Sequence, residues 1–480
     1  MMRRALPWAL APLLLAACQA GTGATLRSTA TLPAVAPAAP GAVASAAAPG
    51  SGPASAAKPP AAISAQADQA DASPDQLIVA LAPGATAAGL FAKPEARGLT
   101  LLREMPLNDR AILTLRVPAA ELAAARARLA TLPEVARIQR NSLAYVHSVP
   151  NDPKVGEQWA HLKQFANTEG AWDKVAGVDQ SKTAVAMIDT GIDKDHEEFA
   201  GRIVGMRNVV AGKDPTNMFD QVGHGTLTAG IMGATGNNGK GGAGVAWGVK
   251  IVAVRADDIA AGTLCGSSFT LGDILAGLKF ACDFTEPGGA RVRVINLSLG
   301  ENRGGVQPLY AEAVAYARRK GILVVASTGN EGSNVVGTPA NAPGVVAVGS
   351  TSRHLDFETV SPFSNYGDRL DLVAPGAGIF VPVPGTSNCV GVSFNDQRNY
   401  AYASGTSEAA PYVSGVAALI FAKYDPNNAS LATPDQAAAM VDKVRAHLLK
   451  SVDDLGVPGW DPSFGAGRIN AEKALTPASI

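Results

Sequence analysis

Short apolar segments alternate with helical segments through the C-terminal two-thirds of this chain. Continuous apolar strands separated by helices indicate a parallel sheet that is covered by helices on both faces. We therefore predict an α/β domain. The predicted strands are Ala184–Ile188, Ile251–Val254, Val292–Leu297, Ile322–Ala326, Val345–Val348 and Leu370–Val373. The predicted helices are Gly272–Cys282, Leu309–Lys320 and Ser407–Lys423.

Two polar residues lie where chemistry is expected in such a sheet. Asp189 directly follows one predicted strand, and Asn330 follows another. Ligands of open α/β sheets usually bind at the carboxyl ends of the strands. Asp189 could also simply cap a turn, since aspartate is common in turns after strands. The position alone leaves both interpretations open.

Three segments supply an acid, a base and a nucleophile, in that order along the chain. The first ends in Asp189-Thr190-Gly191, the second is Gly223-His224-Gly225-Thr226, and the third runs from Ser404 to Pro411 and contains Ser407. A serine hydroxyl is a poor nucleophile unless an adjacent base, itself oriented by an acid, removes its proton. The combination favours covalent catalysis over separate structural roles for the three residues.

With these segments the chain resembles the subtilisin-like serine proteases from about Asn151 to Ile480. The resemblance implies a three-layer catalytic domain with a mostly parallel sheet, in which Asp189, His224 and Ser407 form a triad. It also implies that Asn330 and the Ser407 amide stabilise the oxyanion. The expected protein is a monomeric serine endopeptidase that works through an acyl-enzyme and needs no cofactor for catalysis.

Two positions depart from the pattern of similar enzymes. Leu227 stands where many have histidine, and Glu408 stands where methionine is common. We expect Glu408, in the first turn of a helix, to point to solvent or to interact favourably with the helix dipole. The competing hypothesis is an inactive fold of this family that serves as a surface binding or scaffold module. The intact triad and Asn330 argue against that hypothesis.

The resemblance also implies residues that bind the substrate. Ser298, Leu299 and Gly300 match an edge segment that pairs with the substrate backbone as an added strand. Glu331, together with Glu301, would border the pocket for the residue preceding the cut and would favour basic or large polar side chains. Alternatively, both acids are solvated residues at the rim. A cis peptide bond is expected between Thr338 and Pro339.

A structural calcium ion is a further expectation from the resemblance. Glu198 stands nine residues after Asp189, where similar enzymes have a ligating aspartate. The loop from Thr235 to Lys240 resembles a calcium loop and would contribute Asn237, while Asp152 could add a carboxylate. Oxygen ligands of this kind suit calcium.

The N-terminus has the pattern of a targeting segment. Arg3 and Arg4 precede an apolar run that is too short to span a bilayer permanently, and the run ends in Leu15-Ala16-Ala17-Cys18. This ending resembles a bacterial lipobox, which would make Cys18 a lipid-modified anchor to a membrane. The alternative is an ordinary secretory signal that is cut nearby. Both predict a location outside the cytoplasm, on the cell envelope or secreted.

Four parts are therefore predicted. Residues 1–17 are the signal peptide, and 18–75, rich in Ala, Pro, Gly and Ser, are a disordered tether. Residues 76–149 form a small α+β domain that resembles the propeptide of these enzymes, an intramolecular inhibitor that the enzyme itself cuts off near Ser148. Residues 150–480 are the peptidase domain. The substrates would be proteins or peptides.

Charge and cysteine content narrow the partners and the redox chemistry. The formal net charge of −1 gives no electrostatic reason to expect nucleic acid as a partner. Without Cys18, three cysteines remain, which predicts one disulfide and one free thiol in an oxidising compartment. Cys265 and Cys282 are closest in sequence and are the favoured pair, and Cys389 would then be free.

Overall fold

The structure is a computed structural model of the 480-residue chain. It describes residues 72–142, 149–258, 267–301, 304–354, 357–385, 389, 392–393, 399–477 and 479–480. The predicted signal peptide, Cys18, nearly all of the predicted tether and the segment 143–148 lie outside the described residues.

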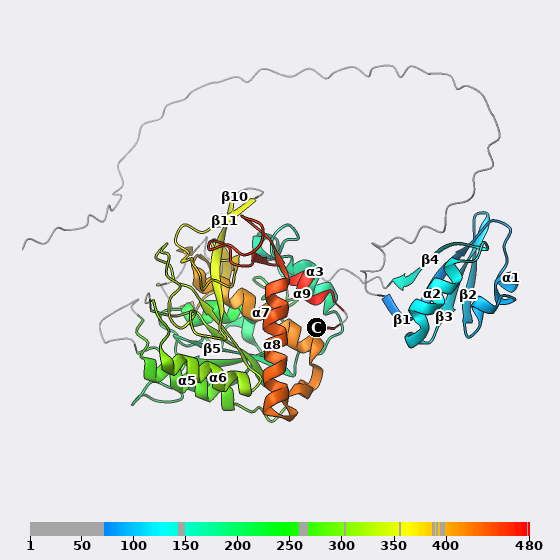
Figure 1. The fold of residues 1–480 in the computed structure, drawn as a ribbon. Helices are drawn as coiled ribbons and strands as arrows, with labels where there is room; N and C mark the ends of the chain where they lie inside the picture. The colour runs from blue at the N-terminus through cyan, green and yellow to red at the C-terminus, as the bar shows by residue number, and fades with distance from the viewer. Residues whose placement is uncertain are drawn as a thin grey trace, which may run out of the picture. The chain divides into compact units, whose positions relative to one another are not determined.

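The N-terminal described segment is a small α+β unit with its own core (Figure 1). Its antiparallel sheet has the strand order β2-β3-β1-β4. Leu77, Val79 and Leu81 of β1 are buried, because alternate side chains of a strand face the same side. The elements are β1 (Ala72–Leu81), α1 (Ala87–Phe91), β2 (Thr100–Leu107), β3 (Arg110–Arg116), α2 (Leu122–Ala130) and β4 (Val135–Ser142).

A mostly parallel sheet forms the centre of the larger domain. Its order is β16-β17-β12-β10-β9-β8-β5-β7-β6, with β11 antiparallel to β10. Every pair from β17 to β6 is parallel. The strands are β5 (Thr183–Asp189), β6 (Ile203–Asn208), β7 (Lys250–Arg255), β8 (Arg291–Leu297), β9 (Leu323–Ser327), β10 (Val346–His354), β11 (Phe357–Val360), β12 (Leu372–Pro375), β16 (Val452–Asp453) and β17 (Arg468–Ile469). The predicted parallel sheet is confirmed.

Helices cover both faces of this sheet, which makes three layers (Figure 1). On one face α5 (Leu271–Asp283) and α6 (Pro308–Arg319) pack, and on the other α4 (His224–Gly233), α7 (Thr406–Tyr424) and α8 (Pro434–Lys450). The sheet has one hydrophobic core on each face, and alternate residues of β5 point into the two cores. Ala184, Ala186 and Ile188 pack into the core on the side of α5 and α6. Val185 and Met187 pack into the core on the side of α4, α7 and α8. A strand buried on both faces has no need of polar positions, and its sequence is therefore continuously apolar.

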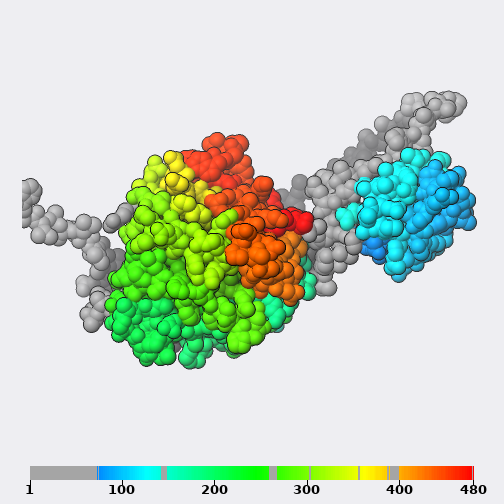
Figure 2. Space-filling model, turned by 60° about the horizontal axis from the view of Figure 1, so that its bottom comes forward, coloured from blue at the N-terminus to red at the C-terminus, as the bar shows by residue number. Residues whose placement is uncertain are grey.

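The remaining elements complete the larger domain. They are α3 (Thr168–Lys174), α9 (Ala471–Leu475) and a small sheet of β13 (Ile379–Pro382), β15 (Tyr400–Ala403) and β14 (Val392–Ser393). The C-terminal segments, orange to red in Figure 2, cover one side of the domain. No helix within the described residues is both long enough and apolar enough to cross a membrane.

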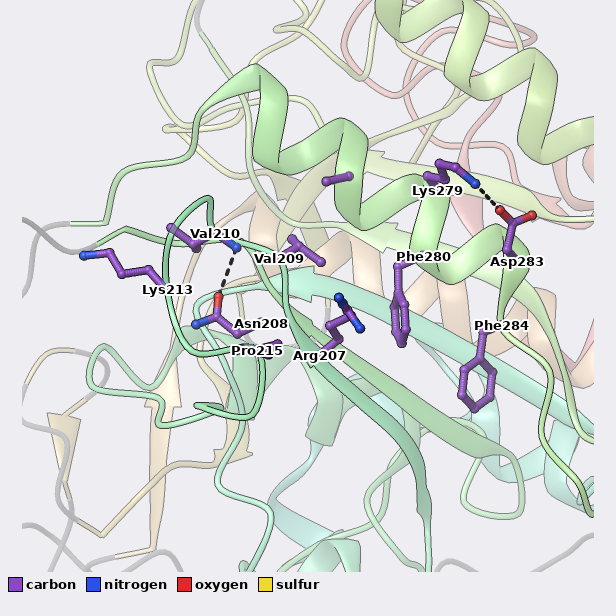
Figure 3. Close-up of a pocket in the computed structure, with 11 residues that line it drawn as sticks. Arg207, Asn208, Val209, Val210, Lys213, Pro215, Lys279, Phe280, Asp283 and Phe284 are labelled. Atoms are coloured by element: carbon purple, nitrogen blue, oxygen red, sulfur yellow. Dashed lines mark hydrogen bonds and ion pairs between the residues drawn. The ribbon is translucent and has the colours of Figure 1, made fainter.

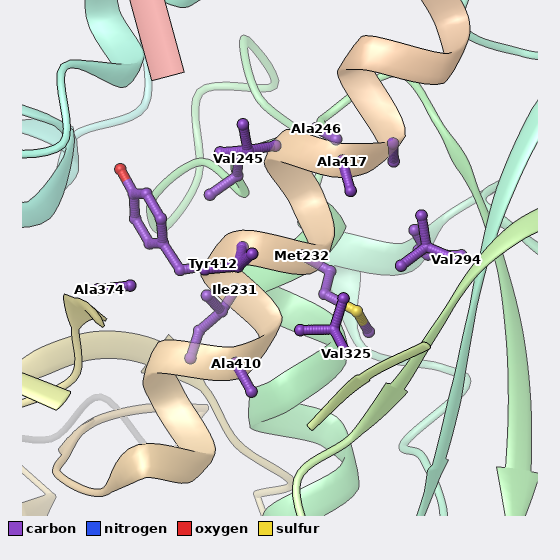
Figure 4. Close-up of a cluster of buried hydrophobic side chains, with 14 of the residues drawn as sticks. Ile231, Met232, Val245, Ala246, Val294, Val325, Ala374, Ala410, Tyr412 and Ala417 are labelled. Atoms are coloured by element: carbon purple, nitrogen blue, oxygen red, sulfur yellow. The ribbon is translucent and has the colours of Figure 1, made fainter. Parts of the chain in front are cut away.

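Helix α7 runs through the core between the sheet and its neighbours. Small residues such as Ala410 and Ala417 allow close packing, and Figure 4 shows them beside Ile231 and Met232 of α4. Val325, on the central strand β9, completes this part of the cluster. Ser407 therefore lies at the start of a helix that is buried on all sides.

The predicted cysteine pairing is wrong. Cys282 is a free, buried cysteine. It shares the inner face of α5 with Ile274 and Leu278, at the four-residue spacing of one helix face, and its side chain therefore packs into the core. Burial raises the pKa of its thiol to about 12. Cys389 is disulfide-bonded, and Cys265 lies outside the described residues.

Candidate active site

Asp189 is the last residue of β5 and is completely buried. Its Oδ1 accepts a hydrogen bond of 2.7 Å from the backbone N–H of Thr190 and lies 2.7 Å from Nδ1 of His224. Its other oxygen accepts a weaker contact of 3.4 Å from the Thr228 hydroxyl. The same carboxylate oxygen is thus held by the backbone and contacts the imidazole.

His224 is the first residue of α4, and close backbone packing sets its position. A Cβ on Gly225 would lie only 2.0 Å from the carbonyl oxygen of Gly191, so only glycine allows α4 to approach the turn after β5 this closely. This approach brings the imidazole to Asp189. Gly225 is therefore a packing requirement of the pair, while Gly223 adopts a positive φ of 88° that favours glycine.

Asp220 joins the turn after β5 to the start of α4, a role that was not predicted from the sequence. Its buried carboxylate accepts hydrogen bonds from the Thr190 hydroxyl, the Gly223 N–H and both the N–H and hydroxyl of Thr226. These contacts tie the start of α4 to the turn that follows Asp189. The only sequence signal is an aspartate placed just before a helix start, which is too common to be diagnostic.

Ser407 is half-buried in the first turn of α7. Its hydroxyl donates to the carbonyl of Ser298 at 3.2 Å. Pro411 lies four residues later and has no N–H to donate to the Ser407 carbonyl. The Ser298 hydroxyl donates to this carbonyl instead, at 2.8 Å. The proline thus leaves an acceptor free, and the contact with Ser298 fixes the nucleophile's helix against the end of β8.

Asn330 is oriented by the same end of α7. Its Oδ1 accepts hydrogen bonds from the N–H of Thr406 at 2.8 Å and from its hydroxyl at 2.9 Å. Because the amide oxygen is held in this way, the NH₂ group is left available as a donor. The N–H of Ser407 belongs to the first turn of α7, where backbone donors have no partner within the helix.

Asn365 orders the loop that carries Asn330 and is a second residue that the sequence analysis missed. Its Oδ1 accepts hydrogen bonds from the N–H groups of Glu331 and Ser333, and its Nδ2 donates to the Thr328 carbonyl. Nδ2 also donates to Oε2 of Glu331 at 2.6 Å. An asparagine in a distant loop gives no sequence signal of this role.

The charges around His224 favour its protonated form. Burial alone would lower the pKa of the imidazole, but the charge of Asp189 and the hydrogen bond to it act in the opposite direction. Glu408 and Asp220 add negative charge, and together these groups raise the pKa of His224 to about 9. The site thus stabilises the imidazolium that a base forms when it accepts a proton.

The predicted substrate segment directly follows β8. Leu299 is buried, whereas Gly300 is exposed, and a Cβ on Gly300 would lie 2.7 Å from the carbonyl of Thr338. The peptide bond between Thr338 and Pro339 is cis, as predicted. Glu301 pairs with Thr338 through backbone hydrogen bonds of 2.8 and 3.0 Å. The segment is therefore covered by Thr338 on one side, and its end at Gly300 is exposed.

The predicted calcium ligands lie close together but are engaged with hydrogen-bond donors. Asp152 accepts from the backbone N–H groups of Asn237 and Asn238, at 2.6 and 3.1 Å. Glu198 accepts from the Tyr400 hydroxyl and from the Asn238 side chain, both at 2.9 Å. Each carboxylate oxygen thus faces an N–H or O–H group rather than open space.

Two further groups of this loop compete with a cation for the carboxylates, a proton on Glu198 and the Lys240 ammonium. Burial raises the pKa of Glu198 to about 7, although hydrogen bonds to it act against this rise, and so a proton competes for the carboxylate near neutral pH. The Lys240 ammonium lies 3.0 Å from the Glu197 carboxylate. With its carboxylates engaged in this way, the loop as described does not fit a calcium ion, and we assign no step of the reaction to one. The calcium site therefore stays a prediction.

A surface groove of about 590 Å³ lies between the end of β6 and α5 (Figure 3). Its charged side chains have partners: Lys279 pairs with Asp283 at 2.5 Å, and the Arg207 guanidinium lies 5.8 Å from the centre of the Phe280 ring. None of the residues lining it belongs to the site described above. We assign it no chemistry.

Comparison with known proteins decides the family. Residues 180–467, which include Asp189, His224, Asn330 and Ser407, match the model of the subtilase family. The chain belongs to the subtilase family. It is therefore a subtilisin-like serine endopeptidase of the hydrolase class, and the predicted fold and enzyme class are confirmed.

Individual relatives support this assignment. The chain is 34% identical to thermitase of Thermoactinomyces vulgaris over 68% of its own length and 99% of that protein. It is 31% identical to an extracellular protease of Xanthomonas campestris, over 85% of the chain and 70% of that protein. Among solved structures, a protease of Pseudoalteromonas arctica matches 69% of the chain with a TM-score of 0.55 and 29% identity.

Proposed function

We propose that this subtilase cleaves protein and peptide substrates outside the cytoplasm with Asp189, His224 and Ser407 as its triad. The observation that carries the proposal is the 2.7 Å contact between Nδ1 of His224 and the buried Asp189 carboxylate. This contact leaves Nε2 of the imidazole for the serine hydroxyl, as a triad requires.

The reaction would proceed in two steps. Nε2 of His224 accepts the proton of Ser407 as Oγ attacks the scissile carbonyl, and the resulting imidazolium then gives this proton to the leaving amine. Asp189 holds the ring and stabilises its charge. Water next attacks the acyl-enzyme with the same base and releases the acid product. Two donors would stabilise the oxyanion in both steps, namely the NH₂ group of Asn330 and the N–H of Ser407.

Substrates would bind as an added strand along Ser298, Leu299 and Gly300, which directly follow β8. Glu331 would border the pocket for the residue before the cut. Its hydrogen bond from Asn365 holds the exposed carboxylate next to the loop of Asn330, where it could meet a cationic side chain. The specificity proposed here is therefore for basic or large polar side chains.

A fluorophosphonate probe tests this function directly. We expect it to label the mature protein at Ser407, because the probe reacts with a serine that an adjacent base activates. Heat-denatured protein serves as the control and should stay unlabelled. Folded protein that is not labelled would support the alternative hypothesis, an inactive scaffold of the same fold.

We further propose that residues 76–149 form an inhibitory propeptide, and that the folded enzyme acts as a monomer. The small unit has a core of its own, and the match to the Xanthomonas campestris protease extends over 85% of the chain, more than the catalytic domain alone. The junction to be cut, near Ser148, lies outside the described residues.

The proposed location is the cell envelope, with a lipid on Cys18 as the anchor. Relatives include an extracellular protease and a cell wall-associated protease of Bacillus subtilis. Arg3, Arg4 and the short apolar run before Cys18 support a lipoprotein signal. The Ala- and Pro-rich tether would keep the enzyme clear of the membrane.

Changing Cys18 to alanine should release the protein from the membrane into the medium or periplasm, because the proposed lipid is the attachment that this change removes. Fractionation followed by activity measurement checks this result. Changing Ser28 to alanine in the same N-terminal region is the matched control and should leave the distribution as in the wild type. Membrane retention of the Cys18→Ala protein would contradict the lipoprotein assignment.

A further inference from the structure

Glu408, directly after the proposed nucleophile, is buried, contrary to the expectation that it points to solvent. Only 4% of its surface is exposed. Its Oε2 packs against the backbone before Ser407, since a Cβ on Gly405 would lie 2.7 Å from this oxygen and 3.3 Å from the Asn330 NH₂ group. The carboxyl group therefore lies within the active site, beside the groups assigned to the oxyanion.

This carboxyl is also incompletely satisfied. Oε2 of Glu408 is buried and has no hydrogen-bond partner among the described residues. A buried polar atom without a partner destabilises the folded state, and a charged one does so more strongly. The start of α7 offers partial compensation, because the positive end of the helix dipole favours an acid in the first turn. A methionine here would avoid this cost, so the acid calls for a functional explanation.

The charge of Glu408 interacts with two residues of the proposed triad, His224 and Asp189. Burial raises the pKa of Glu408 to about 7, the charge of His224 acts against this rise, and the charge of Asp189 adds to it. Around His224, negative charge comes from Asp189 at the end of β5, from Asp220 before α4 and from Glu408 on α7. The imidazole is thus placed among acids from three different elements, rather than next to one aspartate alone.

We propose that Glu408 is a positioning residue for the imidazole of His224. The ionised Glu408 carboxylate favours the imidazolium form of His224. It therefore sets the lowest pH at which the enzyme works well. This inference rests on the proposed triad. No proton passes to Glu408: the proton of Ser407 moves to His224 and then to the leaving amine, while the carboxylate acts through its charge.

The pH dependence follows from the sign of this effect. His224 must be neutral to act as a base, so kcat/KM falls as the pH drops through the pKa of the imidazole. A negative charge nearby raises this pKa, and the acid limb of the wild type is expected near pH 9. Removing the charge should move the limb down by at most about one pH unit. Because the carboxyl itself has a pKa of about 7, it is fully charged only above that pH, and the gain in activity relative to the plateau should be about threefold near pH 8.

The experiment compares kcat/KM from pH 5 to 11 for the wild type and Glu408→Gln. Glu408→Met removes the charge and the unpartnered oxygen together and should show the same downward shift, even if the glutamine variant folds poorly. Glu408→Asp keeps the charge and should keep most of the wild-type limb. Glu312→Gln, at an exposed position on α6, is the matched control for the loss of one acid and should leave the limb in place.

A second readout separates this inference from the proposed function. The rate of fluorophosphonate labelling depends on Ser407 and His224 without a peptide substrate, and it should follow the same shifted pH dependence in Glu408→Gln. If Glu408→Gln and Glu408→Met are labelled but lose kcat/KM at the same pH as the wild type, the proposed role of Glu408 is wrong and the proposed triad stands. Failure to label the folded wild type would instead overturn the proposed function.

Discussion

Ser407→Ala is expected to give a folded precursor that is never cut near Ser148. The change removes the proposed nucleophile and should lower turnover on the order of 10⁶-fold, as expected when a triad loses its serine. It deletes one half-buried oxygen, whose hydrogen bond goes to the Ser298 carbonyl, and leaves the core of α7 unchanged. Folding should therefore survive although processing does not.

Intact-mass spectrometry of both proteins, produced in a protease-deficient host, measures the outcome. The wild type should appear as the mature chain and Ser407→Ala as the precursor, with similar melting temperatures for the folded domain. Ser404→Ala is a suitable control, because the exposed Ser404 hydroxyl contacts the Gly378 N–H and takes no part in the proposed reaction. Identical cleavage of wild type and Ser407→Ala would show that another protease matures the chain.

Asp189→Asn should lower kcat about 10⁴-fold with little change in KM. The carboxylate accepts the Thr190 N–H and faces Nδ1 of His224, so it holds the ring in the tautomer that exposes a basic Nε2. An amide in its place has lost the negative charge and can favour the opposite tautomer. The proposed substrate segment, Ser298–Gly300, does not include this group, and KM should therefore stay near the wild-type value.

Steady-state kinetics on a peptide substrate, with a melting curve for each protein, checks this expectation. The loss of kcat counts only if Asp189→Asn melts at the same temperature as the wild type. Asp189 is completely buried, so a folding defect could mimic a loss of catalysis. Thr228→Val is the control. It removes the 3.4 Å contact to the second oxygen and the 3.0 Å hydrogen bond to the Gly225 carbonyl but leaves the contact between Asp189 and His224, so kcat should fall far less. A comparable loss in both variants would argue against the orienting role of Asp189.

The regular elements of the catalytic domain were largely predictable. Strands such as β5 and β8 are buried on both faces, and this environment makes their sequences continuously apolar. Strand β2 of the small N-terminal unit was missed because its residues are all exposed, and its apolar residues do not alternate regularly with polar ones. Helix α8 was also missed, although its buried residues follow a helical spacing.

Side-chain environments were much less predictable than elements. The sequence gives the spacing of Cys265 and Cys282, but only the fold shows that Cys282 faces the core of α5. Likewise Glu408 was expected to point to solvent or to interact favourably with the helix dipole, and only the fold shows that it packs inward against Gly405. Both errors arise because sequence neighbours do not reveal which other elements cover a side chain.

From the sequence alone, the type of sheet and the residues proposed as acid, base, nucleophile and oxyanion donor could be predicted, because both depend on residue type and local pattern. Only the tertiary structure decided how they are held: Asp220 joins Thr190 to the start of α4, and Asn365 orders the loop of Asn330. Such contacts join residues far apart in the chain, and local sequence carries no record of them. The electrostatic setting of His224 has the same origin, since its three acidic neighbours come from three separate elements.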